Sequence, residues 1–247
     1  MSEILGPLST FAILGVGLLF GLKHATEVDH VVAVSTIVSR HRNVWRSSLV
    51  GALWGAGHTA SLLIIGIFVL TLRIAIPERV SNWLEFCVAL MIIGLGASAL
   101  WRALRKRGDV HVHEHSHDGL SHTHVHFHEA QTKHNKHRVH THAVSRIGIK
   151  PILIGAMHGL AGSGALTLLV LAQIKSTWQG LLYLAVFGVG SIAGMLLMSG
   201  LIGLPFALTS RNLTGLHHRL QAAAAVFSLA FGFWYAYDLL VTNVLPQ

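Results

Sequence analysis

The decapeptide GLKHATEVDH places ionisable side chains inside a long apolar stretch of the chain. His24, Glu27, Asp29 and His30 bring two imidazoles and two carboxylates together within seven residues. Such groups are expensive at membrane depth and normally face a cavity or a partner. Imidazole and carboxylate are also ligands that divalent nickel, cobalt, zinc and copper accept. The decapeptide therefore indicates a metal site or a proton pathway.

The spacing predicts how these side chains would be arranged on a continuous helix. At about 100° per residue, His24, Glu27 and His30 lie within an arc of about 120°. Asp29 lies away from that arc, so we expect it to hydrogen-bond a ligand histidine of another helix, or to join the ligands if the helix unwinds. The alternative is a structural polar cluster in which Lys23 and Glu27, one helical turn apart, neutralise each other.

Two further histidines lie in apolar segments, His58 in GAGHTASL and His158 in GAMHGLAGSG. Either one alone is more typical of a hydrogen-bonded core residue. Together they gain weight, because few other ionisable groups remain in these segments. Glu85 is expected to be solvated near a helix end and without a role. The predicted metal ligands are His24, Glu27, Asp29, His30, His58 and His158.

The elements that would position these residues are transmembrane helices. Hydrophobic residues make up 52% of the 247 residues and charged residues only 11%, against about 25% charged in soluble domains. The sequence predicts an all-α integral membrane protein, since a span needs about 20 apolar residues. The first span is too long for one straight crossing, so we expect it to tilt, protrude or break near the decapeptide. The six predicted transmembrane helices cover residues 8–38, 47–72, 82–104, 147–172, 178–205 and 219–241.

Basic residues predict the orientation. Lysine and arginine gather in the loops that follow the first, third and fifth spans, whereas the opposite side carries only Arg73, Arg79 and Lys175. Because cytoplasmic loops carry the excess of lysine and arginine, we expect a multi-pass protein of the inner (plasma) membrane with both termini outside. The expected domains are a first three-helix half (1–104), a cytoplasmic His-rich loop (105–146) and a second three-helix half (147–247).

The two halves show a weak internal duplication. GLKHA opens the first half and GAMHGLAGSGA the second, and each contains Gly-x-x-His. Three spans per half would make an inverted repeat, an arrangement that places the substrate site of many transporters near the bilayer midplane. His158 would then correspond to His24. The alternative is that two apolar segments resemble each other by chance.

The middle loop is a low-complexity histidine segment. It reads H-x-H-x-H-x-H twice, at 111–117 and 122–128, and residues 111–142 hold twelve of the nineteen histidines. We expect this polar segment to be disordered without metal. Neutral imidazoles bind transition metals in many geometries, which favours labile capture, buffering or sensing of metal. The alternative is a neutral spacer or a pH-responsive linker.

The segment from His24 to His30 reads H-A-T-E-V-D-H and fits H-x4-D-H. It resembles the signature of the nickel/cobalt transporter (NiCoT) family, H-A-x-D-A-D-H, with Glu27 in place of Asp and Val28 in place of Ala. The six-span layout resembles the compact branch of urease-accessory-type nickel permeases. The resemblance implies transport of Ni2+ or Co2+, with Zn2+ as an alternative cargo, no permanently bound cofactor, and uptake rather than efflux. It also implies that HGLAGSG lines the pathway.

Other function classes fit less well. Stripes of aromatic and basic residues, as used for single-stranded nucleic acid, are absent, so no nucleic-acid partner is expected. The sequence has no Walker motif and no H-E-x-x-H pair, which argues against an ATPase and a zinc hydrolase. We expect a non-enzymatic carrier whose partners are the lipid bilayer, divalent metal ions and a cytoplasmic metallochaperone. An efflux carrier and a metal-sensing accessory membrane subunit remain as alternatives.

Overall fold

The computed structural model describes residues 10–72, 77–105, 110–117, 120–127, 148–161 and 176–244. Within these ranges, four helices are long and apolar enough to cross a membrane. They match four of the predicted spans, those at 47–72, 82–104, 178–205 and 219–241. These helices are α3 (Val44–Leu72), α4 (Glu78–Arg105), α7 (Thr177–Asn212) and α8 (Thr214–Leu239), the last continuing into the π-helical turn η2 (Leu240–Val244).

The first predicted span is broken near the decapeptide, which is one of the three outcomes that its length predicted, beside tilting and protrusion. Helix α1 (Thr10–His24) ends within the decapeptide, and α2 (Val28–Val38) begins after three intervening residues. Between them Glu27 is extended, with φ −63° and ψ 147°. The Thr26 hydroxyl donates a hydrogen bond to the Lys23 carbonyl oxygen at 2.6 Å, and this side-chain bond satisfies part of the freed backbone.

The fourth predicted span, 147–172, is described only in its first half. Helix α5 (Lys150–Ala161) carries His158 near its end. Residues 162–175, which include the last three residues of HGLAGSG, lie outside the described part of the chain. The prediction that this stretch lines a pathway therefore stays a prediction.

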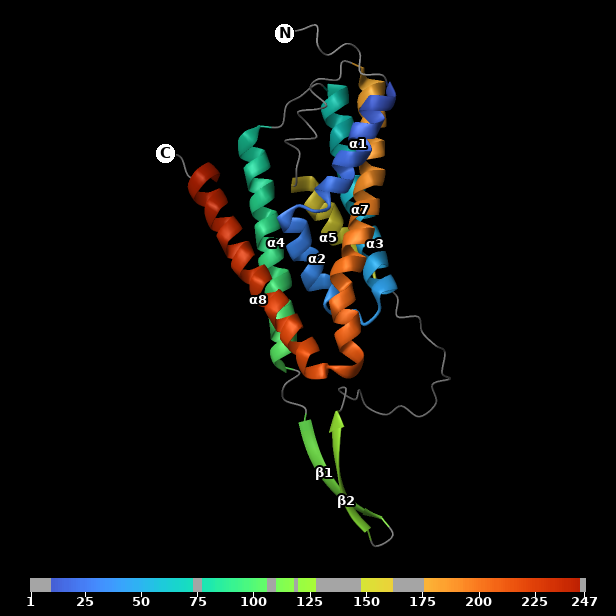
Figure 1. Cartoon of the computed structure of the whole chain (residues 1–247). Coiled ribbons are helices and arrows are strands. Elements are labelled where there is room, and N and C mark those ends of the chain that lie inside the picture. Colours follow the sequence, from blue (N-terminus) through green and yellow to red (C-terminus); the bar gives the residue numbers. More distant parts are fainter. Residues whose placement is uncertain are drawn as a thin grey trace, which may run out of the picture.

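Close helix contacts through glycine build the bundle. A Cβ atom on Gly21 of α1 would collide with the carbonyl of Phe187 on α7, and one on Gly155 of α5 would collide with the carbonyl of Trp54 on α3. Helices α3 and α7 pack against each other, and α4 pairs with α8 beside them (Figure 1). Small residues let helix backbones approach this closely, so α1 and α5 are held against the α3–α7 pair.

The histidine loop differs from the expectation of disorder. Strands β1 (Val110–His117) and β2 (Leu120–Phe127) form an antiparallel hairpin, which Figure 1 shows beyond the end of the bundle where α4 ends. The prediction was wrong for these residues because the H-x-H-x pattern has the two-residue period of a strand. Valine, threonine and phenylalanine at the intervening positions also favour strands. Residues 128–147 lie outside the described part.

The glycine contacts can be tested by adding a methyl group. Gly21→Ala forces a Cβ against the Phe187 backbone, and such overpacking costs about 1–3 kcal/mol, so we expect a lower thermal unfolding midpoint in detergent. The matched control is Gly94→Ala on α4, where a Cβ meets nothing within 4 Å and alanine favours the helix by about 1 kcal/mol. Equal midpoints for the two variants would contradict this packing.

Candidate metal centre

Four histidines from four helices meet at one buried place. His24 ends α1, His30 lies on α2, His58 on α3 and His158 on α5. Their exposed fractions are 3%, 1%, 0% and 0%. The ring centroids of His30 and His158 lie 4.1 Å apart, those of His24 and His30 4.4 Å, and those of His58 and His158 5.9 Å. The structure therefore brings together all four histidines that the sequence singled out.

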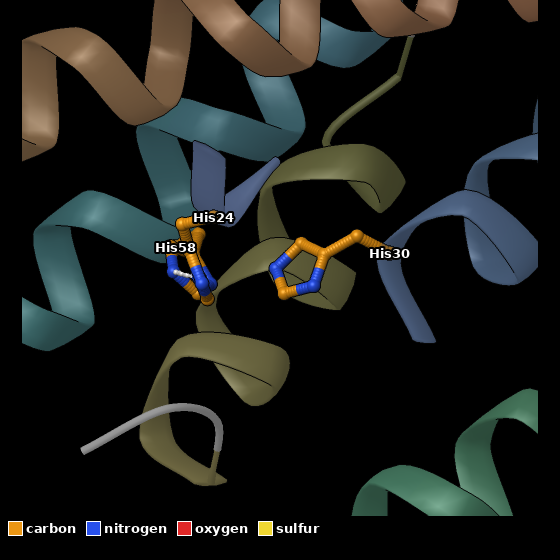
Figure 2. A group of neighbouring side chains, drawn as sticks. All are labelled: His24, His30 and His58. Carbon is orange, nitrogen blue, oxygen red and sulfur yellow. Dashed lines mark hydrogen bonds between the residues drawn. The ribbon is translucent and has the colours of Figure 1, made fainter. Parts of the chain in front are cut away.

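The first group of donor atoms comprises His24, His58 and His30, drawn in Figure 2, whose ligand atoms all lie within 4.8 Å of one another. The Nε2 atoms of His24 and His58 face each other at 3.0 Å. Two nitrogens about 2.1 Å from one metal ion, at an angle of about 90°, also lie about 3.0 Å apart. The same two rings can thus share a proton or coordinate one ion with little movement.

Glu27 supports the first group from its edge. Its Oε2 atom lies 3.0 Å from Nδ1 of His24, while 39% of its side chain is exposed. Metal-bound histidines commonly donate their other N–H to a carboxylate, which fixes the tautomer. A hydrogen bond from Nδ1 of His24 to Glu27 leaves the lone pair of Nε2 directed at His58.

The second group comprises Asp29, His30 and His158, whose ligand atoms also lie within 4.8 Å of one another. Oδ1 of Asp29 lies 2.9 Å from Nδ1 of His30, and Oδ2 lies 2.8 Å from Nε2 of His158. An ionised carboxylate only accepts hydrogen bonds, so both rings donate to it. This is the role expected for Asp29, a hydrogen bond to a histidine of another helix.

This proton arrangement leaves nitrogen lone pairs inside the protein. Nε2 of His30, Nδ1 of His58 and Nδ1 of His158 are buried and have no hydrogen-bond partner within the described residues. An unsatisfied buried polar atom costs about 1–3 kcal/mol, and native proteins contain few of them. A divalent ion of borderline preference would use such imidazole nitrogens as ligands, so this donor set fits a metal.

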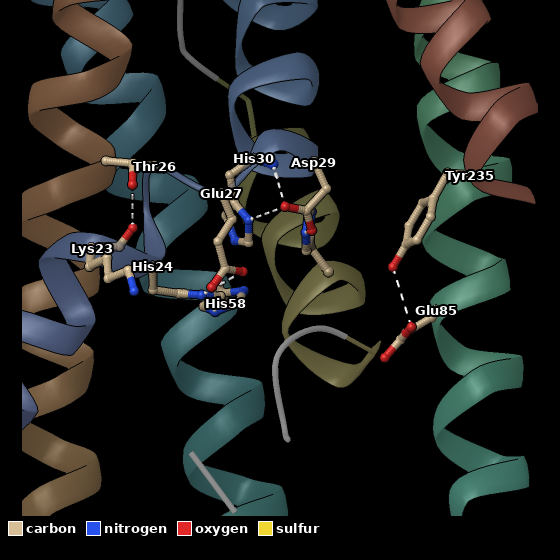
Figure 3. A network of polar contacts seen from close by, with 10 residues as sticks. Lys23, His24, Thr26, Glu27, Asp29, His30, His58, Glu85 and Tyr235 are labelled. Atoms are coloured by element: carbon tan, nitrogen blue, oxygen red, sulfur yellow. Dashed lines mark hydrogen bonds and ion pairs between the residues drawn. The ribbon is translucent and has the colours of Figure 1, made fainter. Parts of the chain in front are cut away.

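The break in the first span decides how these atoms converge. His24, Glu27 and His30 do not share one face of a continuous helix, because the chain turns at residues 25–27. Instead, the end of α1 presents His24 and the start of α2 presents His30 to the same place. Figure 3 shows Glu27 reaching the His24–His58 pair while Asp29 lies beside His30.

Two aromatic residues beside the site, Trp54 and Phe187, were not predicted from the sequence. The Trp54 ring is 1% exposed and lies 5.3 Å from that of His30 and 5.5 Å from that of His158, and the Phe187 ring lies 5.6 Å from that of His24. Trp54 precedes His58 by four residues on α3, so helical spacing could have placed it beside the site. Phe187 carries no comparable signal, because it reaches the site from α7.

Glu85 was also misjudged. It lies within α4, is half-buried, and accepts a hydrogen bond from the Tyr235 hydroxyl of α8 at 3.4 Å. Figure 3 shows this pair to one side of the histidine centre. The expectation of a solvated residue was wrong because α4 extends four residues further toward its N-terminus than the predicted span.

Comparison with known proteins identifies three relatives. The urease accessory protein UreH of Bacillus sp. (strain TB-90) is 40% identical over 234 residues, which cover 95% of this chain and 94% of that protein. The Arabidopsis thaliana chloroplast proteins FOR GROWTH AND FERTILITY 1 and 2 are 25% and 24% identical over 76% and 83% of this chain. The matches cover 48% and 50% of these two proteins.

No protein-family model matches the chain. No solved structure matches it either.

The two carboxylates should contribute unequally to metal binding. Asp29 bonds two buried rings, whereas Glu27 is more exposed and is bonded to His24. Loss of a carboxylate that orients ligand histidines costs about 10–100-fold in metal affinity, so Asp29→Asn should weaken Ni2+ binding by about that factor and Glu27→Gln by less. Equilibrium dialysis of the purified protein against Ni2+ measures both. A larger loss in the Glu27 variant would contradict the assigned roles.

Proposed function

The chain belongs to the family of the urease accessory protein UreH, and on that premise we propose that it carries Ni2+ or Co2+ across a membrane through the buried histidine centre. The observation that carries the proposal is the set of buried imidazole nitrogens without hydrogen-bond partners in the described part, gathered at a break in an apolar helix. Discontinuous helices commonly form the ion sites of transporters. Water ligands would be exchanged there for imidazole.

His30 is the residue that links the two groups of donor atoms in this proposed mechanism. It belongs to both groups of donor atoms, the one with His24 and His58 and the one with Asp29 and His158. A cation held by the first group can pass to the second while it remains bound to His30. With a shared ligand, the ion is never without any ligand between the two sites. A cation without ligands would be costly in an apolar bundle.

The donor chemistry supports nickel or cobalt as cargo. The centre offers imidazole nitrogens and carboxylate oxygens, and neither group of potential ligands contains a thiolate. Imidazole suits nickel, cobalt and zinc, whereas soft sulfur ligands select copper(I). Zn2+ remains the alternative cargo. The resemblance of the H-x4-D-H segment to nickel/cobalt transporters favours the first two ions.

An inverted repeat would explain how the two sides open in turn. Helix α1 packs along α7 of the second half, and α5 packs along α3 of the first half. This reciprocal exchange is what two halves related by a two-fold axis would produce, with the substrate site at their junction. We propose that the halves rock around the centre, so that it opens to one side at a time.

The hairpin fits uptake toward the cytoplasm, the direction that the resemblance to nickel/cobalt transporters favours. Its register pairs His111 with His126, His113 with His124 and His115 with His122. The register thus brings six histidines into directly opposed positions on the two strands. On the side richer in lysine and arginine, the histidine loop would receive metal leaving the centre. Efflux is the alternative direction, with the hairpin as a collector.

Radiometal flux tests the function. Purified protein in proteoliposomes should move Ni2+, and His30→Ala should reduce the initial rate by about tenfold or more because both groups of donor atoms lose a ligand. The matched control is His41→Ala, at the turn after α2, which should leave flux unchanged. If the wild-type protein moves no Ni2+ while still binding it, the chain is a metal-sensing accessory subunit rather than a carrier.

Removal of the histidine loop should weaken transport without abolishing it. Deletion of residues 111–142 removes redundant, exchangeable ligands, whereas the centre in the bundle stays intact. We expect residual Ni2+ flux in the same proteoliposome assay and a changed dependence on metal concentration. Complete loss of flux in a variant that inserts and folds normally would show that the loop is part of the obligatory path.

A further inference from the structure

A second polar site lies away from the histidine centre, at the end of the bundle where α2 and α4 end and α8 begins (Figure 1). A cavity of about 100 Å³ opens there between the three helices. This is well above the volume that one water molecule needs. We name it the basic pocket; its lining residues that matter here are Ser39, Arg40, Arg42, Arg102, His217 and Gln221.

The basic pocket concentrates positive charge. Arg40 and Arg42 come from the turn after α2, and Arg102 comes from the last turn of α4. Arginine remains protonated in proteins, so these three groups are permanent cations. Arg40 and Arg42 are exposed to solvent, whereas Arg102 is partly buried. Partial desolvation lowers the pKa of Arg40, and repulsion by the positive charge of Arg102 lowers it further.

These charges lack a carboxylate partner within the described residues. The ion pairs found there all involve histidines of the metal centre. The nearest acidic residue before Arg102 on α4 is Glu85, about 25 Å away by helical rise. Arginine side chains commonly pair with carboxylates or phosphates. The pocket therefore has the hydrogen-bond donors of an anion site, and the described parts of the chain supply no anion to it.

Hydrogen bonds hold the helices around the pocket together and leave most N–H donors of the arginines available. Gln221 of α8 donates a hydrogen bond from Nε2 to the Ser39 carbonyl oxygen at 2.7 Å, which ties α8 to the end of α2. The buried His217 ring contacts the Thr209 hydroxyl at 3.4 Å. Arg102 donates to the Ser98 hydroxyl at 3.3 Å through one of its nitrogens, and a guanidinium carries five N–H donors.

The surroundings of the basic pocket are those expected at the level of lipid headgroups. Trp45 and Trp101 lie at the same end of the bundle and are 71% and 59% exposed. Exposed tryptophans are typical of the membrane–water interface, and basic pockets between transmembrane helices bind anionic headgroups. Planar guanidinium forks match the oxygens of a phosphate group.

We propose that the basic pocket binds a phosphate group, either that of an anionic lipid headgroup or that of a soluble phosphate, through Arg40, Arg42 and Arg102. The bound anion neutralises the repulsion between the arginines and joins α2, α4 and α8 at one end of the bundle. This site is independent of the proposed metal transport, because it shares no residue with the histidine centre.

The test compares two probes on the delipidated full-length protein in detergent. Short-chain phosphatidylglycerol represents the headgroup, inorganic phosphate represents the soluble anion, and short-chain phosphatidylcholine controls for amphiphile binding. The readout is the thermal unfolding midpoint as a function of probe concentration. We expect phosphatidylglycerol to raise the midpoint. Stabilisation by inorganic phosphate as well would identify the free anion as a ligand, and stabilisation by phosphatidylglycerol alone would identify the headgroup.

Arg40→Gln combined with Arg102→Gln should raise the half-saturating probe concentration by about tenfold or more, since charge-assisted hydrogen bonds are lost. The matched control is Arg46→Gln, an exposed arginine of the first turn of α3 that does not line the pocket. Without probe, the double variant should unfold no earlier than the wild type, because it removes a repulsion.

If the double variant fails to fold, Arg40→Lys takes its place, since lysine keeps the charge but loses the bidentate fork; it should weaken binding by a smaller factor. Absence of stabilisation by either probe in the wild-type protein would overturn the proposal. So would the same half-saturating concentration in the wild type and in the arginine variants.

Discussion

The carboxylate of Asp29 holds the histidine centre together through hydrogen bonds to two buried rings. His30 and His158 come from different helices, and each directs one N–H to a different oxygen of this carboxylate at 2.8–2.9 Å. A buried carboxylate must be paired to remain charged inside an apolar bundle. The same bonds fix which nitrogen of each ring carries the proton, so the other nitrogen keeps a lone pair that is buried without a hydrogen-bond partner in the described residues. The bonds to Asp29 thus set both the orientation of the two rings and the nitrogen of each ring that can bind a metal ion.

The helix break supplies the geometry that this interaction needs. A continuous helix from α1 to α2 would separate His24 and His30 by about 9 Å along its axis, whereas the turn at residues 25–27 brings their ring centroids to 4.4 Å. Close packing through Gly21 and Gly155 holds α1 against α7 and α5 against α3. Because these contacts have no room for another methyl group, the ligands are set by the backbone positions of several helices.

Polar groups are segregated within the molecule. The histidine centre lies inside the bundle, where orphaned nitrogens and one shared carboxylate favour a cation. The basic pocket lies at the end of the bundle, where arginines without carboxylate partners in the described ranges favour an anion. The two places therefore have opposite ligand preferences, and both follow from the charges and donors that line them.

The sequence by itself determined the class of protein and the residues of interest. Apolar segment lengths predicted the long helices, and the excessive length of the first segment predicted that it would tilt, protrude or break. Rare ionisable residues in such segments stand out, so His24, His30, His58 and His158 were identified before any fold was known. The H-x-H-x period of the loop also carried a strand signal, which was overlooked in favour of composition.

Only the tertiary structure decided which atoms meet. The division of the donors into two groups that share His30, the pairing of Glu85 with Tyr235, and the enclosure by Trp54 and Phe187 all join residues of different helices. The basic pocket likewise joins the ends of α2 and α4 to the start of α8. Helical periodicity specifies which side chains share a face of one helix, but the crossing of helices depends on side-chain packing between segments far apart in the chain. A single sequence contains no local signal for that packing.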